Sequence, residues 1–233
     1  MTCFVLVHGG WHGGWCWERV VPLLEAAGHE VHAPTLTGLG ERSHLVRAVA
    51  GPETHVADIV QVLEWRDLRD VMLVGHSYGG MVITGVAAQV PERIAHLVYL
   101  DAFVPTESGQ GATAFAPPER AAEIRAATVD GMVAPTGFER WAARAEDLAW
   151  LRRMCTPHPA NCFDRGVVLT GREAEVAHRS YILCDEHNPS PFRQFHDRYA
   201  DDPAWICHRL PCLHDAMVEM PDALADLLMK AET

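Results

Sequence analysis

The sequence predicts an α/β protein with a mostly parallel sheet that helices cover on both faces. Short apolar runs suited to buried strands alternate along much of the chain with segments of helical periodicity. One such run ends in a glycine-rich turn that leads directly into a helix-like segment, within 71–90. The chain has 233 residues, enough for one domain with a sizeable core. We therefore expect a single domain over 1–233.

The amino-terminal half supplies the first strands and helices of this alternation. The expected strands are 3–7, 29–33, 71–74 and 96–100, and the expected helices are 17–27, 56–65 and 81–90. Strands that alternate with helices form parallel sheets, and functional side chains of such sheets lie beyond the carboxyl ends of the strands. Asp101 follows the strand at 96–100 and stands at such an end.

The alternation stops between residues 106 and 179, where we expect an inserted helical cap over the site. Helices are expected at 119–127 and 138–153. The aromatic residues of the insertion either face a substrate or pack the cap onto the body of the protein; they are Phe115, Phe138, Trp141 and Trp150. The alternation then resumes, with strands at 180–184 and 204–209, a helix at 192–199 and a final helix from Pro221.

The most informative motif is G-x-S-x-G, at Gly75-His76-Ser77-Tyr78-Gly79. Between a strand and a helix this motif predicts a turn so sharp that the serine backbone is strained and the flanking positions have no room for side chains. Such a turn exposes the serine hydroxyl. It also points the first amides of the helix, and the positive end of its dipole, at whatever Ser77 attacks. We therefore expect Ser77 to be a nucleophile.

A second glycine-rich stretch, H-G-G-W-H-G-G-W at 8–15, follows the first expected strand. It is either a plain turn or a loop in which the amide of Gly10 joins that of Tyr78 to form an oxyanion hole. His8 and His12 are four residues apart, but on a glycine loop this spacing does not define a helix face. We expect no metal there.

Composition excludes several classes of function. The net charge is −12 and no cluster of basic residues occurs, so no nucleic-acid partner is expected. Neither a signal segment nor a membrane span is evident, and we expect a cytoplasmic protein. The seven cysteines are odd in number and lack C-x-x-C spacing, which favours reduced, mostly buried thiols. A disulfide between Cys155 and Cys162 is the alternative.

Four segments together resemble the α/β-hydrolase superfamily, and within it the compact esterases that include plant methyl esterases, hydroxynitrile lyases and related bacterial esterases. These segments are F-V-L-V-H-G-G-W-H-G-G-W-C-W at 4–17, L-L-E-A-A-G-H-E-V at 23–31, V-G-H-S-Y-G-G-M at 74–81 and L-H-D-A-M-V-E-M-P at 213–221. The resemblance spans nearly the whole chain. It implies that Ser77 is the nucleophile, that His214 is the general base, and that Gly10 and Tyr78 supply the oxyanion donors.

The third member of the triad is where the sequence departs from this family. Most members place an aspartate where this chain has His187, and a histidine cannot stabilise an imidazolium as a carboxylate does. Asp185 or Glu186 of the same loop is one replacement. Asp101 is the other, and we favour it because a carboxylate at a strand end is held rigidly. A purely structural role for Asp101 is the alternative.

The expected activity is hydrolysis of small, uncharged carboxylic esters, aromatic ones among them, with amides or carbamates as further substrates of the same machinery. Trp11, Trp15 and Phe103, together with Tyr78, are expected to line an apolar substrate entrance. No metal or organic cofactor is expected. The expected partner is a small-molecule ester, and the chain is expected to be a monomer or a homodimer.

Two other functions compete with ester hydrolysis. Family lyases handle cyanide with a threonine in the early loop and a lysine after the catalytic histidine, whereas this chain has Gly9 and Asp215 there. An anionic Asp215 would repel cyanide, which disfavours a lyase. A catalytically inactive homologue that binds a small ligand is the second alternative, since a fold alone does not establish activity.

Overall fold

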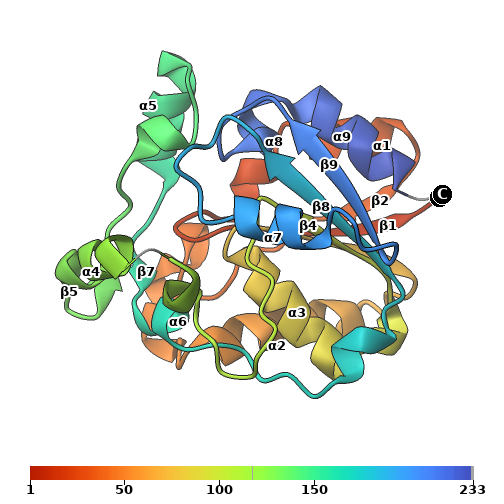
Figure 1. Ribbon diagram of the computed structural model, residues 1–233, viewed down its shortest axis with the longest axis horizontal. Coiled ribbons are helices and arrows are strands. Elements are labelled where there is room, and N and C mark those ends of the chain that lie inside the picture. Colours follow the sequence, from red (N-terminus) through yellow and green to blue (C-terminus); the bar gives the residue numbers. More distant parts are fainter. Residues whose placement is uncertain (117, 232–233) are drawn as a thin grey trace.

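The computed structural model describes residues 1–116 and 118–231, and its centre is a six-stranded sheet (Figure 1). The strand order is β2-β1-β3-β4-β8-β9, and all neighbouring strands are parallel. The strands are β1 (Cys3–Val7), β2 (Glu30–His32), β3 (Val71–His76), β4 (Ile94–Leu100), β8 (His178–Cys184) and β9 (Trp205–Leu210). The expected parallel α/β architecture is confirmed.

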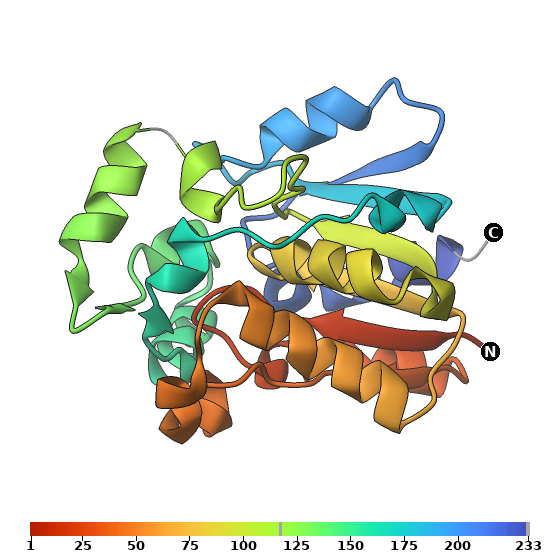
Figure 2. The same ribbon diagram turned by 90° about the horizontal axis from the view of Figure 1, so that it is seen from below.

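Helices cover both faces of this sheet (Figures 1 and 2). On one face lie α1 (Val21–Ala26), α8 (Ala216–Glu219) and α9 (Pro221–Lys230); on the other lie α2 (Pro52–Trp65), α3 (Gly79–Gln89) and α7 (Arg193–Tyr199). Successive strand residues point to opposite faces. Val5 and Val7 therefore join the core beneath α2 and α3, whereas Phe4 and Leu6 join the core beneath α1 and α9.

The helix expected at 17–27 is broken. A 3₁₀ helix, η1 (Gly14–Trp17), is followed by turns, and α1 begins only at Val21. Pro22 lies in the first turn of α1. Proline has no amide hydrogen and clashes with the preceding helical turn, so it is tolerated at the start of a helix but not in its interior.

The helix expected at 138–153 is also broken, into η5 (Phe138–Arg140) and α5 (Ala145–Met154). Backbone carbonyls at the end of η5 and directly after it bind the loop before α8. The carbonyl of Arg140 accepts a hydrogen bond from the amide of His214 at 3.2 Å, and that of Trp141 accepts one from the amide of Asp215 at 3.0 Å. These tertiary contacts replace the helical ones, and they tie the 106–179 segment to His214.

The 106–179 segment holds more than helices. It contains η4 (Ala112–Phe115), α4 (Pro118–Ala126), α5, α6 (Asn161–Asp164), η6 (Arg172–Glu175) and a three-stranded antiparallel sheet of β5 (Thr128–Val129), β6 (Met132–Val133) and β7 (His158–Pro159). Both views place α4 and α5 beyond one end of the main sheet rather than on its faces (Figures 1 and 2). That 106–179 acts as a cap with these boundaries stays a prediction.

Two remaining 3₁₀ helices, η2 (Gly40–Ala48) and η3 (Pro91–Arg93), connect elements of the body. All seven cysteines are free thiols in this structure, four of them buried, and Cys155 and Cys162 are not paired. That the protein is kept reduced stays a prediction. No helix among the described residues is long and apolar enough to cross a membrane.

Candidate active site

Ser77 lies in the sharp turn between β3 and α3, and its backbone is strained as the motif predicts. Its φ is +55°, a left-handed conformation that non-glycine residues rarely adopt. A Cβ atom at Gly75 would lie 2.6 Å from the carbonyl oxygen of Gly79, and one at Gly79 would lie 2.7 Å from that of Val7. Only glycine therefore fits on either side of this serine.

Ser77 opens into a cavity of about 310 Å³ between the sheet and the 106–179 segment. His214, from the loop between β9 and α8, lines the same cavity. Gly10 and Tyr78 line it as well, so the structure brings together the four residues expected to supply the nucleophile, the base and the oxyanion donors. Among the described residues, no hydrogen bond joins Ser77 to His214. Such bonds are often loose before substrate binds.

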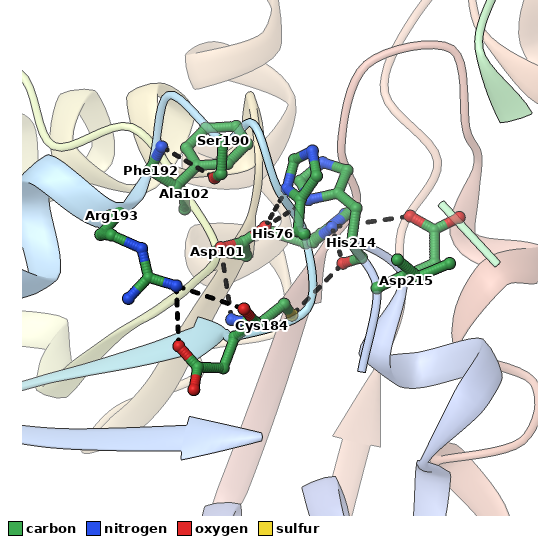
Figure 3. Close-up of polar contacts among 12 residues, drawn as sticks. His76, Asp101, Ala102, Cys184, Ser190, Phe192, Arg193, His214 and Asp215 are labelled. Carbon is green, nitrogen blue, oxygen red and sulfur yellow. Dashed lines mark hydrogen bonds and ion pairs between the residues drawn. The ribbon is translucent and has the colours of Figure 1, made fainter. Parts of the chain in front are cut away.

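The carboxylate of Asp101 lies behind His214 (Figure 3). It is fully buried at the end of β4, where its φ of +40° is also left-handed. His214 donates a hydrogen bond from Nδ1 to Oδ2 of Asp101 at 2.6 Å, and the amide of Cys184 donates one to Oδ1 at 3.3 Å. Because Nδ1 is used in this way, Nε2 is the nitrogen that His214 retains for chemistry in the cavity.

His187 is a second histidine on the same carboxylate. Its Nδ1 donates to Oδ2 of Asp101 at 2.8 Å, and its side chain lines the cavity. Burial opposes ionisation of Asp101, but the hydrogen bonds from His187 and His214 outweigh burial and hold the pKa of Asp101 below its ordinary value. Burial, with the nearby His214, lowers the pKa of His187, which favours the neutral ring. The sequence signal for the His187–Asp101 contact was that this chain has a histidine at a position where most family members have an aspartate.

The other candidate acids lie elsewhere. The carboxylate of Asp185 is 39% exposed and pairs with Arg193 at 2.8 Å and with Arg209 at 3.4 Å. Glu186 is exposed. Of the three carboxylates that the sequence left open, the structure brings only Asp101 to His214.

The amides of Gly10 and Tyr78 are placed to receive an anion. Neither amide donates a hydrogen bond within the described part of the chain, and both residues face the cavity. Nδ1 of His8 donates to the carbonyl oxygen of Gly9 at 2.8 Å and so fixes the peptide that carries the amide of Gly10. Tyr78 stands at the start of α3, where helix amides are unpaired and the dipole is positive.

The expected aromatic entrance is only partly present. Trp11 and Phe103 line the cavity, as expected, but Trp15 does not. Trp15 packs instead against His12 and Trp150, with ring centroids 5.3 and 5.0 Å apart. The glycines of the early loop turn the chain between Trp11 and Trp15, so the two indoles face different surroundings.

The aromatic residues of the 106–179 segment divide in the same way. Trp141 lines the cavity, whereas Phe138, Trp150 and Phe115 pack against other rings. Phe163 is a further lining residue that the sequence did not single out.

Four clusters among the described residues contain atoms that metals bind, and hydrogen bonds engage several of these atoms in two of the clusters. Asp101, His187 and His214 form one cluster, in which both rings donate to the carboxylate. His55, His158 and Cys162 form another. His55 contacts the Tyr78 hydroxyl and the Thr37 carbonyl, and Nδ1 of His158 accepts from the amide of Trp11. That the protein needs no cofactor stays a prediction.

Comparison with known proteins adds to this geometry. The sequence profile described as "Alpha/beta hydrolase family" matches residues 4–227. A "Carbendazim hydrolyzing esterase" of Nocardioides sp. (strain SG-4G) is 44% identical over 239 residues, covering 98% of each chain. "Methylesterase 1" of Arabidopsis thaliana is 39% identical over 104 residues, 44% of this chain and 40% of that protein. An extracellular alpha/beta-hydrolase from a Paenibacillus species superposes with a TM-score of 0.86 at 23% identity, covering 99% of both chains.

Proposed function

Because this chain belongs to the alpha/beta hydrolase family and is a carboxylic ester hydrolase, we propose that it cleaves small, uncharged esters through an acyl-enzyme on Ser77. The observation that carries this proposal is the hydrogen bond of 2.6 Å between Asp101 and His214, because His214 lines the same cavity as Ser77. The resemblance to esterases gives the reaction class, and this geometry supports the role that we propose for each residue.

In this mechanism the hydroxyl of Ser77 turns toward Nε2 of His214, which takes its proton as the oxygen attacks the acyl carbon. Asp101 holds the imidazole by Nδ1 and stabilises the imidazolium. The amides of Gly10 and Tyr78 donate hydrogen bonds to the oxyanion. His214 then protonates the leaving alcohol and activates the water that releases the acid from Ser77.

The cavity supports a small and largely apolar substrate. Trp11, Phe103, Trp141 and Phe163 lie around Ser77, and a volume of about 310 Å³ suits a small ligand. Esters of short acids with aromatic or aliphatic alcohols fit this description. Carbendazim belongs in the first substrate panel because the name of the relative at 44% identity says that it hydrolyses this compound.

The decisive experiment measures p-nitrophenol release from short-chain p-nitrophenyl esters by the wild-type protein and by Ser77→Ala. We expect turnover by the wild type and at most background rates from the variant, because the nucleophile is gone. The variant must show the wild-type circular dichroism spectrum. Equal turnover by both proteins would exclude Ser77 as the nucleophile, and none by a folded wild type would favour an inactive, ligand-binding homologue.

The cellular setting is a separate part of the proposal. Seven free thiols support a reducing compartment, and we propose a cytoplasmic location. We also propose that the enzyme acts as a monomer or a homodimer, since one chain supplies every residue of the mechanism. Cell fractionation and light scattering test these two statements.

A further inference from the structure

His12 lies fully within the protein, and both of its ring nitrogens face hydrogen-bond acceptors. Nδ1 is 2.7 Å from the carbonyl oxygen of Gly10, and Nε2 is 3.1 Å from Oδ2 of Asp215. His12 is 2% exposed and Asp215 is completely buried. A carbonyl oxygen can only accept a hydrogen bond, so Nδ1 of His12 must carry a proton. The contact between Nε2 and the carboxylate of Asp215 needs a second proton. Together, His12 and Asp215 therefore hold one proton more than a neutral imidazole beside a carboxylate.

The neighbouring histidines differ from His12 in their partners. Nε2 of His8 accepts a hydrogen bond from the amide of Leu36, so this ring must be neutral, and burial lowers the pKa of His8 to about 3. Nε2 of His76 donates to the carbonyl oxygen of His214, but Nδ1 is buried and has no hydrogen bond to any described residue, and burial lowers the pKa of His76. For His12, burial also disfavours charge, but Asp215 and the Gly10 carbonyl outweigh burial and raise its pKa.

The surroundings of His12 stabilise a cation. The indole of Trp15 stacks on its ring at 5.3 Å, and that of Trp141 lies 5.4 Å away. Aromatic faces attract cations at such distances. The other titratable groups that face the pair from neighbouring elements are neutral by burial or belong to the active site; they are His8, His76, His158, Cys16, Cys155, Cys184, His187 and His214.

Asp215 connects this pair to the catalytic loop because it directly follows His214. Figure 3 shows the two side chains leaving the loop on different sides, that of His214 toward Asp101 and that of Asp215 away from it. Oδ1 of Asp215 has no hydrogen bond within the described residues and lies 3.7 Å from Nε2 of His76. Among the described residues, the carboxylate of Asp215 thus depends on His12 for its one direct hydrogen bond.

We propose that the buried His12–Asp215 ion pair is a positioning device that holds the oxyanion loop and the catalytic histidine loop in one fixed arrangement. His12 fixes the carbonyl of Gly10, while His8 fixes the carbonyl of Gly9, so the peptides on both sides of Gly10 are held by imidazoles. Asp215 anchors His12 beside His214. This inference rests on the proposed function, in which the amide of Gly10 stabilises the oxyanion.

A consequence is a loss of turnover at alkaline pH. When the pair gives up its proton, His12 retains one N–H and must abandon either Gly10 or Asp215. A misplaced Gly10 amide stabilises the transition state less, whereas substrate binding in the cavity is little affected. The turnover number should therefore fall at high pH while KM stays nearly constant.

The experiment compares the wild type with Asp215→Asn and His12→Asn. Histidine side-chain NMR should show a wild-type His12 ring that is protonated at neutral pH and an Asp215→Asn ring that is not. The amide resonance of Gly10 should shift or broaden in both variants, while that of the distant Gly28 stays unchanged. With p-nitrophenyl esters, kcat should fall about 10–100-fold at unchanged KM, because a displaced oxyanion donor costs less than the roughly 10²–10³-fold loss of a removed one. The loss of kcat at alkaline pH should begin at lower pH in Asp215→Asn and should be absent in His12→Asn.

Asp147→Asn is the matched control, because Asp147 is a buried carboxylate that pairs with Arg19 and Arg144 away from the cavity. This variant should lose stability yet keep the Gly10 resonance and kcat. A wild-type His12 that titrates near pH 6.5, or an Asp215→Asn protein with unchanged kcat and Gly10 resonance, would overturn the proposal. A protonated His12 and a sensitive Gly10 without any ester turnover would instead refute the proposed function.

Discussion

Asp101 and Asp215 are both completely buried, and each accepts a hydrogen bond from a histidine ring. They differ in what the second nitrogen of that ring meets. Nε2 of His214 is left for the cavity, whereas the second nitrogen of His12 is bound to a backbone carbonyl. A buried carboxylate–imidazole pair can therefore either transfer a proton or retain it. The outcome depends on the group that the second ring nitrogen contacts.

The two carboxylates also differ in how well they are supported. Asp101 accepts from two rings and one amide, and its left-handed backbone is strained. Asp215 has an ordinary φ of −92°, and one of its oxygens has no hydrogen bond among the described residues. Strain at Asp101 is typical of a functional position. Asp215 resembles half of a structural ion pair whose loss leaves a buried charge uncompensated.

The largest expected effect comes from Asp101→Asn, which tests whether this pair moves a proton. We expect kcat for a p-nitrophenyl ester to fall on the order of 10⁴-fold, because the amide cannot hold the productive tautomer or stabilise an imidazolium. Asparagine tolerates the left-handed backbone of this position, so the fold should survive. Asp185→Asn is the control and should stay near wild-type activity. Equal, small losses in both variants would contradict the proposed triad.

The contribution of the His12–Asp215 pair to the free energy of unfolding should depend on pH. The folded pKa of Asp215 is lowered, so its contribution is present above the unfolded value of about 3.9 and is lost as pH falls through the folded value. The folded pKa of His12 is raised, so its contribution is complete below about 6.5 and is lost as pH rises through the folded value.

Urea denaturation should therefore show the largest difference between wild type and Asp215→Asn from about pH 4 to about pH 6.5. A difference of roughly 3 kcal/mol is the expected size for breaking a buried pair. A constant difference across the whole pH range would mean that Asp215 contributes packing rather than charge.

Substitutions of His187 test whether Asp101 needs hydrogen bonds from both histidine rings. His187→Phe removes one hydrogen bond and should raise the pKa of Asp101, so that on acidification kcat/KM is lost at a higher pH, by about one unit. His187→Asn retains an N–H donor and should restore most of the wild-type profile. Superimposable pH profiles for the wild type and His187→Phe would show that this hydrogen bond does not tune the acid.

The smallest expected effect concerns the ring stacked on His12. Trp15→Phe should shift the alkaline limb of kcat to lower pH by less than about one unit, since a phenyl face stabilises a cation less than an indole does. The buried indole nitrogen of Trp15 makes no hydrogen bond within residues 1–116 and 118–231, so the substitution removes none there. The acid limb of the same profile should not move. A shifted acid limb would mean that the two pairs are coupled.

The sequence by itself determined the features that depend on neighbouring residues. Apolar runs and helical periodicity give strands and helices wherever they occur, so the parallel sheet followed from local patterns. The strained turn at Ser77 followed likewise, because Gly75 and Gly79 are dictated by contacts within a few residues and with the adjacent strand. The breaks at 18–20 and 141–144 were missed where Pro22 and a distant loop overrode helical periodicity.

Only the tertiary structure decided which distant side chains meet. His12 and Asp215 are 203 positions apart, and no periodicity relates them. Asp101 reaches His214 rather than leaving that contact to Asp185 because β4 lies beside β8 in the sheet, with its end directed at the loop before α8. Because these side chains are buried, water does not compete for their hydrogen bonds. The protonation of each histidine therefore depends on partners that folding brings close to it.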